Sequence, residues 1–165
     1  MINTDYIKQY FILIYGGVKM EKLFIKLVRP TAIIPTRSTE GSAGYDIYAC
    51  LTEQIILSQG ETRMIASGVS IALEPGYAAF IYARSGLGIK HGIIPANCVG
   101  VIDSDYRGEI MVGIKNTSDM PYTIQPGERI AQLVIAQCEL PELIVCDSLD
   151  ETIRGNGGFG STGVK

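Results

Sequence analysis

The alternation typical of a β-strand is clearest in Glu109-Ile-Met-Val-Gly-Ile-Lys115, where branched apolar side chains occupy every second position. This period of two places the branched side chains on one face of a sheet. Leu23-Phe-Ile-Lys-Leu27 also alternates, and Ile130-Ala-Gln-Leu-Val-Ile135 resembles a strand buried on both faces. Because no long stretch has a helical period, the sequence predicts an all-β fold.

Turn signals separate these stretches. Glu74-Pro75-Gly76-Tyr77 and Gln125-Pro126-Gly127-Glu128 place Pro and Gly where a type II turn requires them, and Gln59-Gly60 is a further turn signal. Strands at this spacing favour a sandwich, a jelly roll or a barrel. One short helix is expected after Arg84-Ser85, through Leu87 to Lys90.

Length and composition limit the number of domains and the classes of function that are possible. A chain of 165 residues and 17.9 kDa is expected to form one domain. A hydrophobic fraction of 47% and a charged fraction of 19% indicate a globular protein. The net charge of -3 argues against binding to a nucleic-acid backbone, so any positive charge that meets an anionic ligand must be local.

The four cysteines (Cys50, Cys98, Cys138 and Cys146) have no metal-binding spacing, and we expect reduced, mostly buried thiols. His91 is the one histidine, which makes a Ser-His-Asp or Cys-His centre a poor interpretation.

Residues 1–19 are predicted to be an N-terminal extension that function does not need. The apolar run from Tyr10 to Val18 is shorter than the roughly 20 residues that span a bilayer. A basic start and a small-residue cleavage site, which mark a signal peptide, are both missing. Met20, followed by Glu21-Lys22, looks like a second start.

Four segments carry groups suited to chemistry. Ala43-Gly-Tyr-Asp46 is one, and Arg84-Ser-Gly-Leu87 is either a contact for one phosphate chain or an ordinary exposed turn. The other two have alternatives as well. Gly100-Val-Ile-Asp-Ser-Asp-Tyr-Arg-Gly-Glu109 brings Asp103, Asp105 and Glu109 into one turn, where carboxylates bind a metal, share protons or lie in solvent. Arg154-Gly-Asn-Gly-Gly-Phe-Gly-Ser-Thr-Gly163 is either a disordered end or a clamp for phosphate and base, because its glycines would let backbone N–H groups approach an anion.

The sequence resembles the trimeric dUTP diphosphatases in five motifs, which occur in the order expected for that family. They are Ala43-Gly-Tyr-Asp-Ile47, Arg84-Ser-Gly-Leu87, Asn97-Cys-Val-Gly-Val-Ile-Asp-Ser-Asp-Tyr-Arg-Gly-Glu109, Gly127-Glu-Arg-Ile-Ala-Gln-Leu133 and Arg154-Gly-Asn-Gly-Gly-Phe-Gly-Ser-Thr-Gly163. The third and fifth motifs are highly specific, whereas the first two mean little alone. Ala83 departs from the proline that often precedes the second motif.

The resemblance implies a jelly-roll-like β-barrel with one short helix and a flexible glycine-rich C-terminal tail. Residues 20–150 would form this domain, and residues 151–165 would form a lid over the active site. Family members are homotrimers whose active sites draw motifs from more than one chain. The partners implied are dUTP and further copies of the chain, with no nucleic acid and no membrane, in the cytoplasm or alternatively a nuclear or viral-host compartment.

The activity implied is hydrolysis of dUTP to dUMP and pyrophosphate, which keeps uracil out of DNA and supplies dUMP for dTMP synthesis. Asp103 would be the general base that activates the attacking water. The cofactor would be Mg²⁺, held mainly by the phosphates and by waters, with Asp46 touching its water shell.

The substrate contacts implied by the resemblance divide by the part of dUTP that they meet. The phosphates would contact Arg84, Ser85, Gly86 and Gln132, and the lid would add Arg154, Phe159, Gly160, Ser161 and Thr162, with Phe159 stacked on uracil. The base would lie in a narrow hairpin pocket around Asn97, Gly100 and Val101, and Tyr106 would pack beneath the deoxyribose. Two rival interpretations are a dCTP deaminase of the same fold and a nucleotide-binding module without activity.

Overall fold

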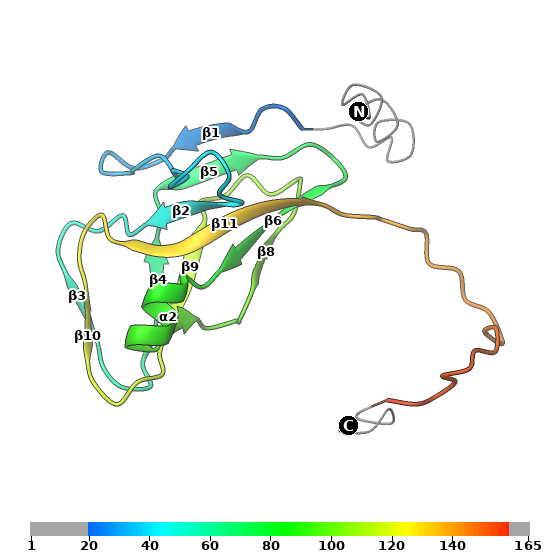
Figure 1. Ribbon diagram of the computed structural model, residues 1–165. Coiled ribbons are helices and arrows are strands. Elements are labelled where there is room, and N and C mark those ends of the chain that lie inside the picture. Colours follow the sequence, from blue (N-terminus) through cyan, green and yellow to red (C-terminus); the bar gives the residue numbers. More distant parts are fainter. Residues whose placement is uncertain (1–19, 159–165) are drawn as a thin grey trace, which may run out of the picture.

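The computed structural model describes residues 20–158, which form β-strands and one short helix (Figure 1). The extension 1–19 and the residues from Phe159 onward lie outside the described residues. The strands are β1 (Phe24–Leu27), β2 (Gly44–Tyr48), β3 (Ile55–Leu57), β4 (Thr62–Ala66), β5 (Val69–Ala72), β6 (Tyr77–Tyr82), β7 (Ile93–Pro95), β8 (Gly100–Ile102), β9 (Met111–Asn116), β10 (Tyr122–Ile124) and β11 (Arg129–Gln137). The helix is α2 (Ser85–His91). The expectation of an all-β fold with one short helix is confirmed over this range.

The strands pair in four small antiparallel sheets (Figure 1). The largest has the order β2-β11-β6-β8, so that the long strand β11 lies between β2 and β6. The others are β4-β9-β7, β1-β5 and β10-β3. Side chains from the inner faces of these sheets form one apolar core, in which isoleucine is the commonest residue.

The predicted strands are found with shifted ends. β9 begins at Met111 rather than at Glu109, because the Ile110 amide donates to the carbonyl of Val69 (2.8 Å) and so leaves the ladder with β4. Strand β11 buries Ala131 and Leu133 in the core, but Gln132 and Val134 on its outer face are only half-buried in the single chain.

The turns follow the Pro-Gly signals. Gly76 and Gly127 have φ of 84° and 72°, and the amides of Tyr77 and Glu128 close their turns on the carbonyls three residues earlier, at 3.2 and 3.1 Å. Helix α2 ends at Gly92, whose φ of 65° is left-handed. A Cβ there would lie 2.8 Å from the amide nitrogen of Ser118, so only glycine fits without movement.

Asn116 is a polar residue with no exposed surface, and it ties three segments together. Its side-chain amide donates to the carbonyls of Leu57 (3.0 Å) and Met120 (2.7 Å), and its Oδ1 accepts from the Ser118 amide (2.9 Å) and hydroxyl (2.8 Å). Since each polar atom of the side chain has a partner, the burial of Asn116 costs little, whereas its removal would take a hydrogen bond from each of these three segments.

The cysteines are free, as expected, but their burial differs from the prediction. Cys50 alone is buried, Cys138 is half-buried, and Cys98 and Cys146 are exposed, because the latter two lie in a turn and in the C-terminal arm rather than on inner strand faces. Across residues 20–158, no helix has the length and apolar character needed to cross a membrane. The cytoplasmic location stays a prediction.

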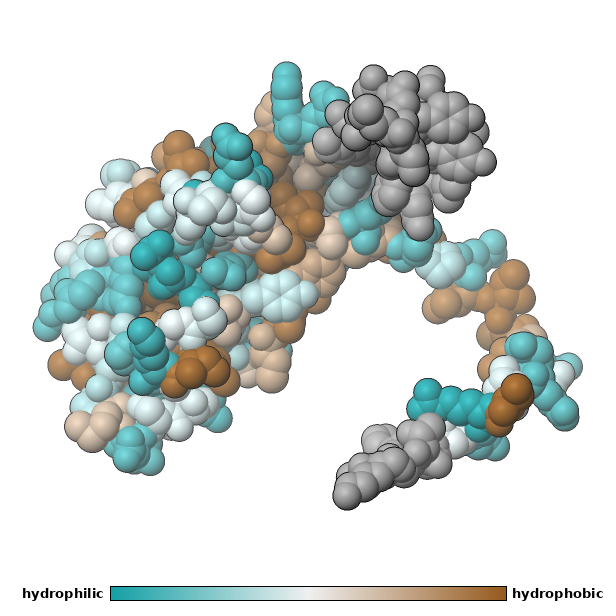
Figure 2. Space-filling model, viewed as in Figure 1, coloured by the Kyte–Doolittle hydropathy of each residue, from teal (hydrophilic) through white to brown (hydrophobic). Residues whose placement is uncertain are grey.

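The chain after β11, residues 138–158, runs away from the body as an extended arm (Figures 1 and 2). Large apolar side chains are almost fully exposed along it, including Leu143 (91%), Val145 (98%) and Leu149 (84%). Burial of such side chains against another surface would stabilise an assembly by roughly 1.5–3 kcal/mol each.

We expect Asn116→Leu to lower the free energy of unfolding by about 2–4 kcal/mol, because the apolar side chain removes the hydrogen bonds to the carbonyls of Leu57 and Met120 and from the Ser118 amide. Thermal and urea unfolding measure this loss. Ser118→Ala, which removes one hydroxyl, is the matched control and should cost less than Asn116→Leu. Equal stability of Asn116→Leu and the wild type would contradict the role assigned to this side chain.

Candidate active site

A hollow of about 230 Å³ opens beside β8 and β9. Its lining includes the residues that the sequence assigns to the base, the sugar and the activation of water: Asn97, Gly100, Val101, Asp103 and Tyr106. These residues come from the β7-β8 connection, from β8 and from the turn that follows it. The fold therefore gathers much of the third motif around one concave surface.

The connection from β7 to β8 is a tight turn between two sheets, because β7 pairs with β9 and β8 pairs with β6. The Cys98 amide donates to the carbonyl of Pro95 (3.1 Å), and Cys98 has a φ of 64°, which is uncommon for a residue with a Cβ. Gly100 lets β8 approach β6, because a Cβ there would lie 3.2 Å from the Cβ of Ile81 and 3.5 Å from the side-chain Nδ2 of Asn97. Backbone groups of this turn can thus come close to a planar ligand, but the predicted hairpin is not formed, because β7 and β8 belong to different sheets.

Asp103 follows β8 directly. Ile102 is buried, whereas Asp103 is exposed, so the backbone leaves the core at this residue, as expected. The Tyr106 amide donates to the Asp103 carbonyl (3.1 Å), and the Arg107 guanidinium donates to the Ser104 carbonyl (2.6 Å). The carboxylate is therefore presented on a short, internally bonded turn at the rim of the hollow.

The carboxylates of this turn do not form a metal cage. Asp105 is exposed, and Glu109 accepts hydrogen bonds from Nε (2.6 Å) and Nη2 (2.8 Å) of Arg29 and from the Gly68 amide (2.8 Å). Nowhere between residues 20 and 158 do three His, Cys, Asp or Glu side chains gather closely enough to hold a metal ion. Of the three alternatives for the cluster, solvent exposure describes Asp103 and Asp105, whereas Glu109 fits none of them because it pairs with Arg29.

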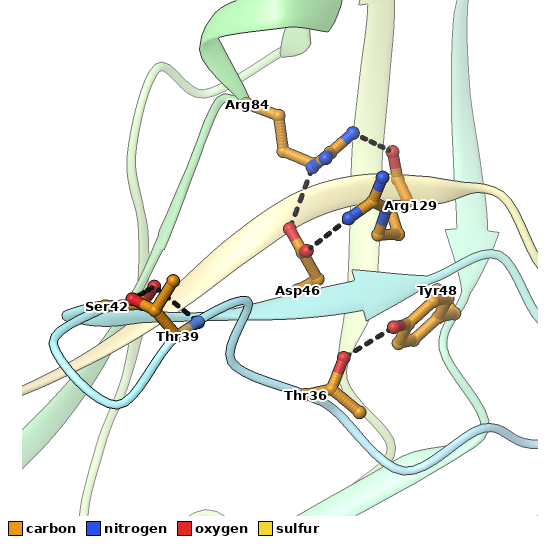
Figure 3. A network of polar contacts seen from close by, with 7 residues as sticks. All are labelled: Thr36, Thr39, Ser42, Asp46, Tyr48, Arg84 and Arg129. Carbon is orange, nitrogen blue, oxygen red and sulfur yellow. Dashed lines mark hydrogen bonds and ion pairs between the residues drawn. The ribbon is translucent and has the colours of Figure 1, made fainter.

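Asp46 lies between two arginines (Figure 3). Arg84 Nε donates to Oδ1 (2.8 Å) and Arg129 Nη1 donates to Oδ2 (3.1 Å), while Arg84 Nη1 also donates to the Arg129 carbonyl (3.2 Å). The Asp46 side chain is 5% exposed, against 23% for Arg84 and 47% for Arg129. A small cationic surface with a fixed carboxylate results, which suits an anionic ligand.

The residues near Asp46 match the predicted phosphate contacts. Gln132 on β11 lies opposite Asp46 on β2 and opposite Tyr82 on β6. Arg84 precedes α2, which starts with the exposed Ser85 and Gly86. A carboxylate has about four lone-pair sites, so Asp46 can still accept from a water of a hydrated Mg²⁺, but one carboxylate cannot hold the ion alone.

The two groups of residues are separate within one chain. Among the described residues, the lining of the hollow includes none of the predicted phosphate contacts Asp46, Arg84, Ser85, Gly86 and Gln132. Arg154 also lies apart from the hollow: it is exposed on the arm, where its Nε donates to the Gly157 carbonyl (2.9 Å). Phe159, Gly160, Ser161 and Thr162 lie outside the described residues.

Two arginines at the site received no role from the sequence. Arg129 lies within the fourth motif, so its pairing with Asp46 could have been suspected from that motif. Arg29 belongs to none of the motifs, and it meets Glu109 across 80 residues of sequence. Local sequence patterns do not indicate contacts between residues that lie so far apart in the sequence.

Glu109 has a lowered pKa. The hydrogen bond from Arg29 is the main cause, with the Gly68 amide and the charge of Arg29 acting in the same direction, and burial opposes them. The side chain is 18% exposed. Glu109 is therefore more firmly ionised in the folded protein than in the unfolded chain.

Comparison with known proteins gives one consistent result. The dUTPase family model matches residues 31–163. The deoxyuridine 5'-triphosphate nucleotidohydrolase of Hahella chejuensis is 50% identical over 133 residues, which are 80% of this chain and 88% of the relative.

A variant of the Staphylococcus bacteriophage 80alpha dUTPase, solved with dUpNHpp, superposes with a TM-score of 0.81 at 30% identity and covers 88% of this chain and 100% of its own. A dUTPase variant from phage phi11 of S. aureus, whose structure describes the coordination of a structural Mg(II) ion, has a TM-score of 0.70 at 27% identity and covers 78% of this chain and 98% of its own. The fold is therefore the predicted jelly-roll-like type.

We expect the ion pair of Glu109 to make stability depend on pH in the acid range. Because the folded pKa lies below the ordinary value of 4.5, the contribution is complete above that value and is lost as the pH falls through the folded pKa. Melting temperatures between pH 3 and pH 7 should therefore fall more steeply for the wild type than for Glu109→Gln. Parallel curves for the two proteins would show that Glu109 gains nothing from Arg29.

Proposed function

The chain belongs to the dUTPase family, and we propose that it hydrolyses dUTP at the α–β phosphoanhydride to dUMP and pyrophosphate. The observation that carries the proposal is the hollow that gathers Asn97, Gly100, Val101, Asp103 and Tyr106. By this activity the protein would keep uracil out of DNA and supply dUMP for dTMP synthesis. We also propose a cytoplasmic location for it.

Asp103 would act as the general base. Its exposed carboxylate, on a turn fixed by its own backbone, would accept a proton from a water whose oxygen attacks the α-phosphorus. The bond from the α-phosphorus to the bridging oxygen breaks, and pyrophosphate leaves with the electron pair. The products are dUMP, pyrophosphate and the proton held by Asp103.

The phosphate chain would lie against Arg84, Ser85 and Gly86, with Gln132 beside the α-phosphate. The guanidinium of Arg84, which is fixed by Asp46, offers a pre-positioned cation, and the exposed start of α2 offers a hydroxyl and backbone N–H groups. Bound Mg²⁺ would neutralise charge on the triphosphate, and Asp46 would accept a hydrogen bond from its water shell.

Recognition of the nucleoside would follow from the turn between β7 and β8 and from Tyr106. Backbone groups around Gly100 and Val101, with the Asn97 amide, can pair with the polar edge of uracil, and a cytosine would leave buried groups unsatisfied. The Tyr106 ring would pack beneath the deoxyribose, where a 2′-hydroxyl would find no room.

Residues 20–150 would form the catalytic domain and residues 151–165 a lid. Arg154, Gly160, Ser161 and Thr162 would close on the γ-phosphate, and Phe159 would stack on the uracil and exclude water. Residues 1–19 would be an extension that catalysis does not need.

A homotrimer with shared active sites would join the two separate groups of residues. The hollow and the Asp46 cluster lie apart in one chain, so a complete site needs a second copy. Exposed apolar side chains support such an assembly. They lie on the outer face of the largest sheet, at Tyr82 (40% exposed) and Val101 (60%), and along the arm after β11.

We expect wild-type protein with Mg²⁺ to release pyrophosphate rapidly from dUTP and only slowly from dTTP, dCTP and UTP. Asp103→Asn keeps the shape of the side chain but cannot accept the proton, so kcat should fall by about 10²–10⁴-fold with little change in KM. Ammonia release from dCTP would instead indicate a deaminase, and binding of dUTP without turnover would indicate a nucleotide-binding module.

Shared sites predict complementation between two inactive variants. Asp103→Asn and Arg84→Gln chains, each inactive alone, should regain activity when they are unfolded and refolded together, because some mixed sites then contain one intact set. Pyrophosphate release and sedimentation of the refolded mixture measure this. Sharing of Asp103 and Arg84 between chains would be ruled out if a protein that sediments as a monomer were active. It would also be ruled out if a mixture shown to contain mixed trimers did not regain activity.

A further inference from the structure

Glu109 ends the turn that starts at Asp103, and its side chain is bound by residues that are far from that turn in the sequence. Both carboxylate oxygens accept from Arg29, at 2.6 and 2.8 Å, and one of them also accepts from the Gly68 amide at 2.8 Å. Two parallel hydrogen bonds from a planar guanidinium fix orientation as well as distance. The end of the turn is thus held at one place on the body of the protein.

The surface that holds Glu109 is rigid. Gly68 has a φ of 70°, and a Cβ there would lie 2.5 Å from the Cβ of Ala32 and 2.9 Å from the sulfur of Cys50. Its carbonyl accepts from the Val28 amide (2.8 Å), so Arg29 directly follows a residue that is bonded to Gly68. The segment after β1 and the turn before β5 are therefore packed so closely that no residue larger than glycine fits at position 68.

The anchored end is linked to the candidate catalytic residues. The Tyr106 hydroxyl donates to the Glu109 carbonyl (3.0 Å), and the Tyr106 amide donates to the Asp103 carbonyl (3.1 Å). A Cβ on Gly108 would collide with the Tyr106 ring, 2.6 Å from its Cζ, so the ring folds closely over the turn. A second attachment joins the Ser70 hydroxyl to the Arg107 carbonyl (2.7 Å).

We propose that Glu109, held by Arg29, is a positioning residue that fixes the Tyr106 ring and the Asp103 turn, and so sets both turnover and discrimination against ribonucleotides. This inference rests on the function proposed above. A shift of about 1 Å in a reacting group can lower a rate by about 10²-fold, so a small loosening of this turn would be visible in kcat. Loosening of Tyr106 would at the same time admit a 2′-hydroxyl.

The competing interpretation is a salt bridge that only adds stability, and partly exposed pairs usually add little. The chain offers a matched control in Glu61. Its carboxylate accepts from Arg63 Nε at 2.6 Å and from the Ser58 amide at 2.8 Å, with 27% and 50% of the two side chains exposed, against 18% and 47% for Glu109 and Arg29. Glu61 and Arg63 belong neither to the hollow nor to the Asp46 cluster.

The experiment compares kcat and KM for dUTP and UTP in the wild type, Glu109→Gln, Arg29→Gln, Arg29→Lys and Glu61→Gln, at a temperature well below every melting transition. We expect Glu109→Gln and Arg29→Gln to lower kcat for dUTP about tenfold and to reduce the ratio of kcat/KM for dUTP over UTP. Arg29→Lys, which keeps the charge but not the paired hydrogen bonds, should retain more of both quantities than Arg29→Gln. Glu61→Gln should match the wild type.

Several outcomes would overturn the inference. If the wild type is active and Glu109→Gln has the same kcat and the same selectivity, Glu109 has no positioning role, and the proposed function still holds. Losses in Glu61→Gln equal to those in Glu109→Gln would assign the effect to general stability. If Glu109→Gln does not fold, the two Arg29 variants decide, because they keep the bond from Gly68 to Glu109. A wild type without pyrophosphate release would refute the proposed function, and this inference with it.

Discussion

The antiparallel pairing of β11 with β2 on one side and β6 on the other is the constraint on which the rest of the structure depends. This register sends Ala131 and Leu133 into the core and places Gln132 on the outer face between Asp46 and Tyr82. A slip by one residue would exchange the two faces and turn Ala131 and Leu133 out of the core. The same pairing that builds the core therefore assembles the candidate phosphate site.

The site of one chain is divided, and the division follows from topology. Asp46, Arg84 and Gln132 gather around β11, whereas Asn97, Asp103 and Tyr106 gather around β8, beyond β6 in the same sheet. The outer face of the largest sheet is partly apolar, and the arm has exposed leucine and valine side chains. Apolar residues are visible along the arm in Figure 2. Such surfaces are what a chain would need to bring these halves together from different copies. Shared sites would make activity depend on assembly.

The sequence predicts the features that local chemistry decides. Pro-Gly turns, strand alternation and the short helix ending at Gly92 could all be expected, because each depends on the conformational preferences of a few neighbouring residues. Residue types and family resemblance also named the lining of the hollow. The pairing of Arg29 with Glu109 could not be expected, since it depends on how segments 80 residues apart pack.

The central claim is that water attacks the α-phosphorus from a position set by the Asp103 turn. Hydrolysis of dUTP in water enriched in oxygen-18, followed by mass spectrometry of both products, tests it most directly. Attack at the α-phosphorus places one labelled oxygen in dUMP and none in pyrophosphate. Label in pyrophosphate and none in dUMP would show that water attacks the β-phosphorus, and would contradict the assignment of Asp103 and the orientation of the substrate in the hollow.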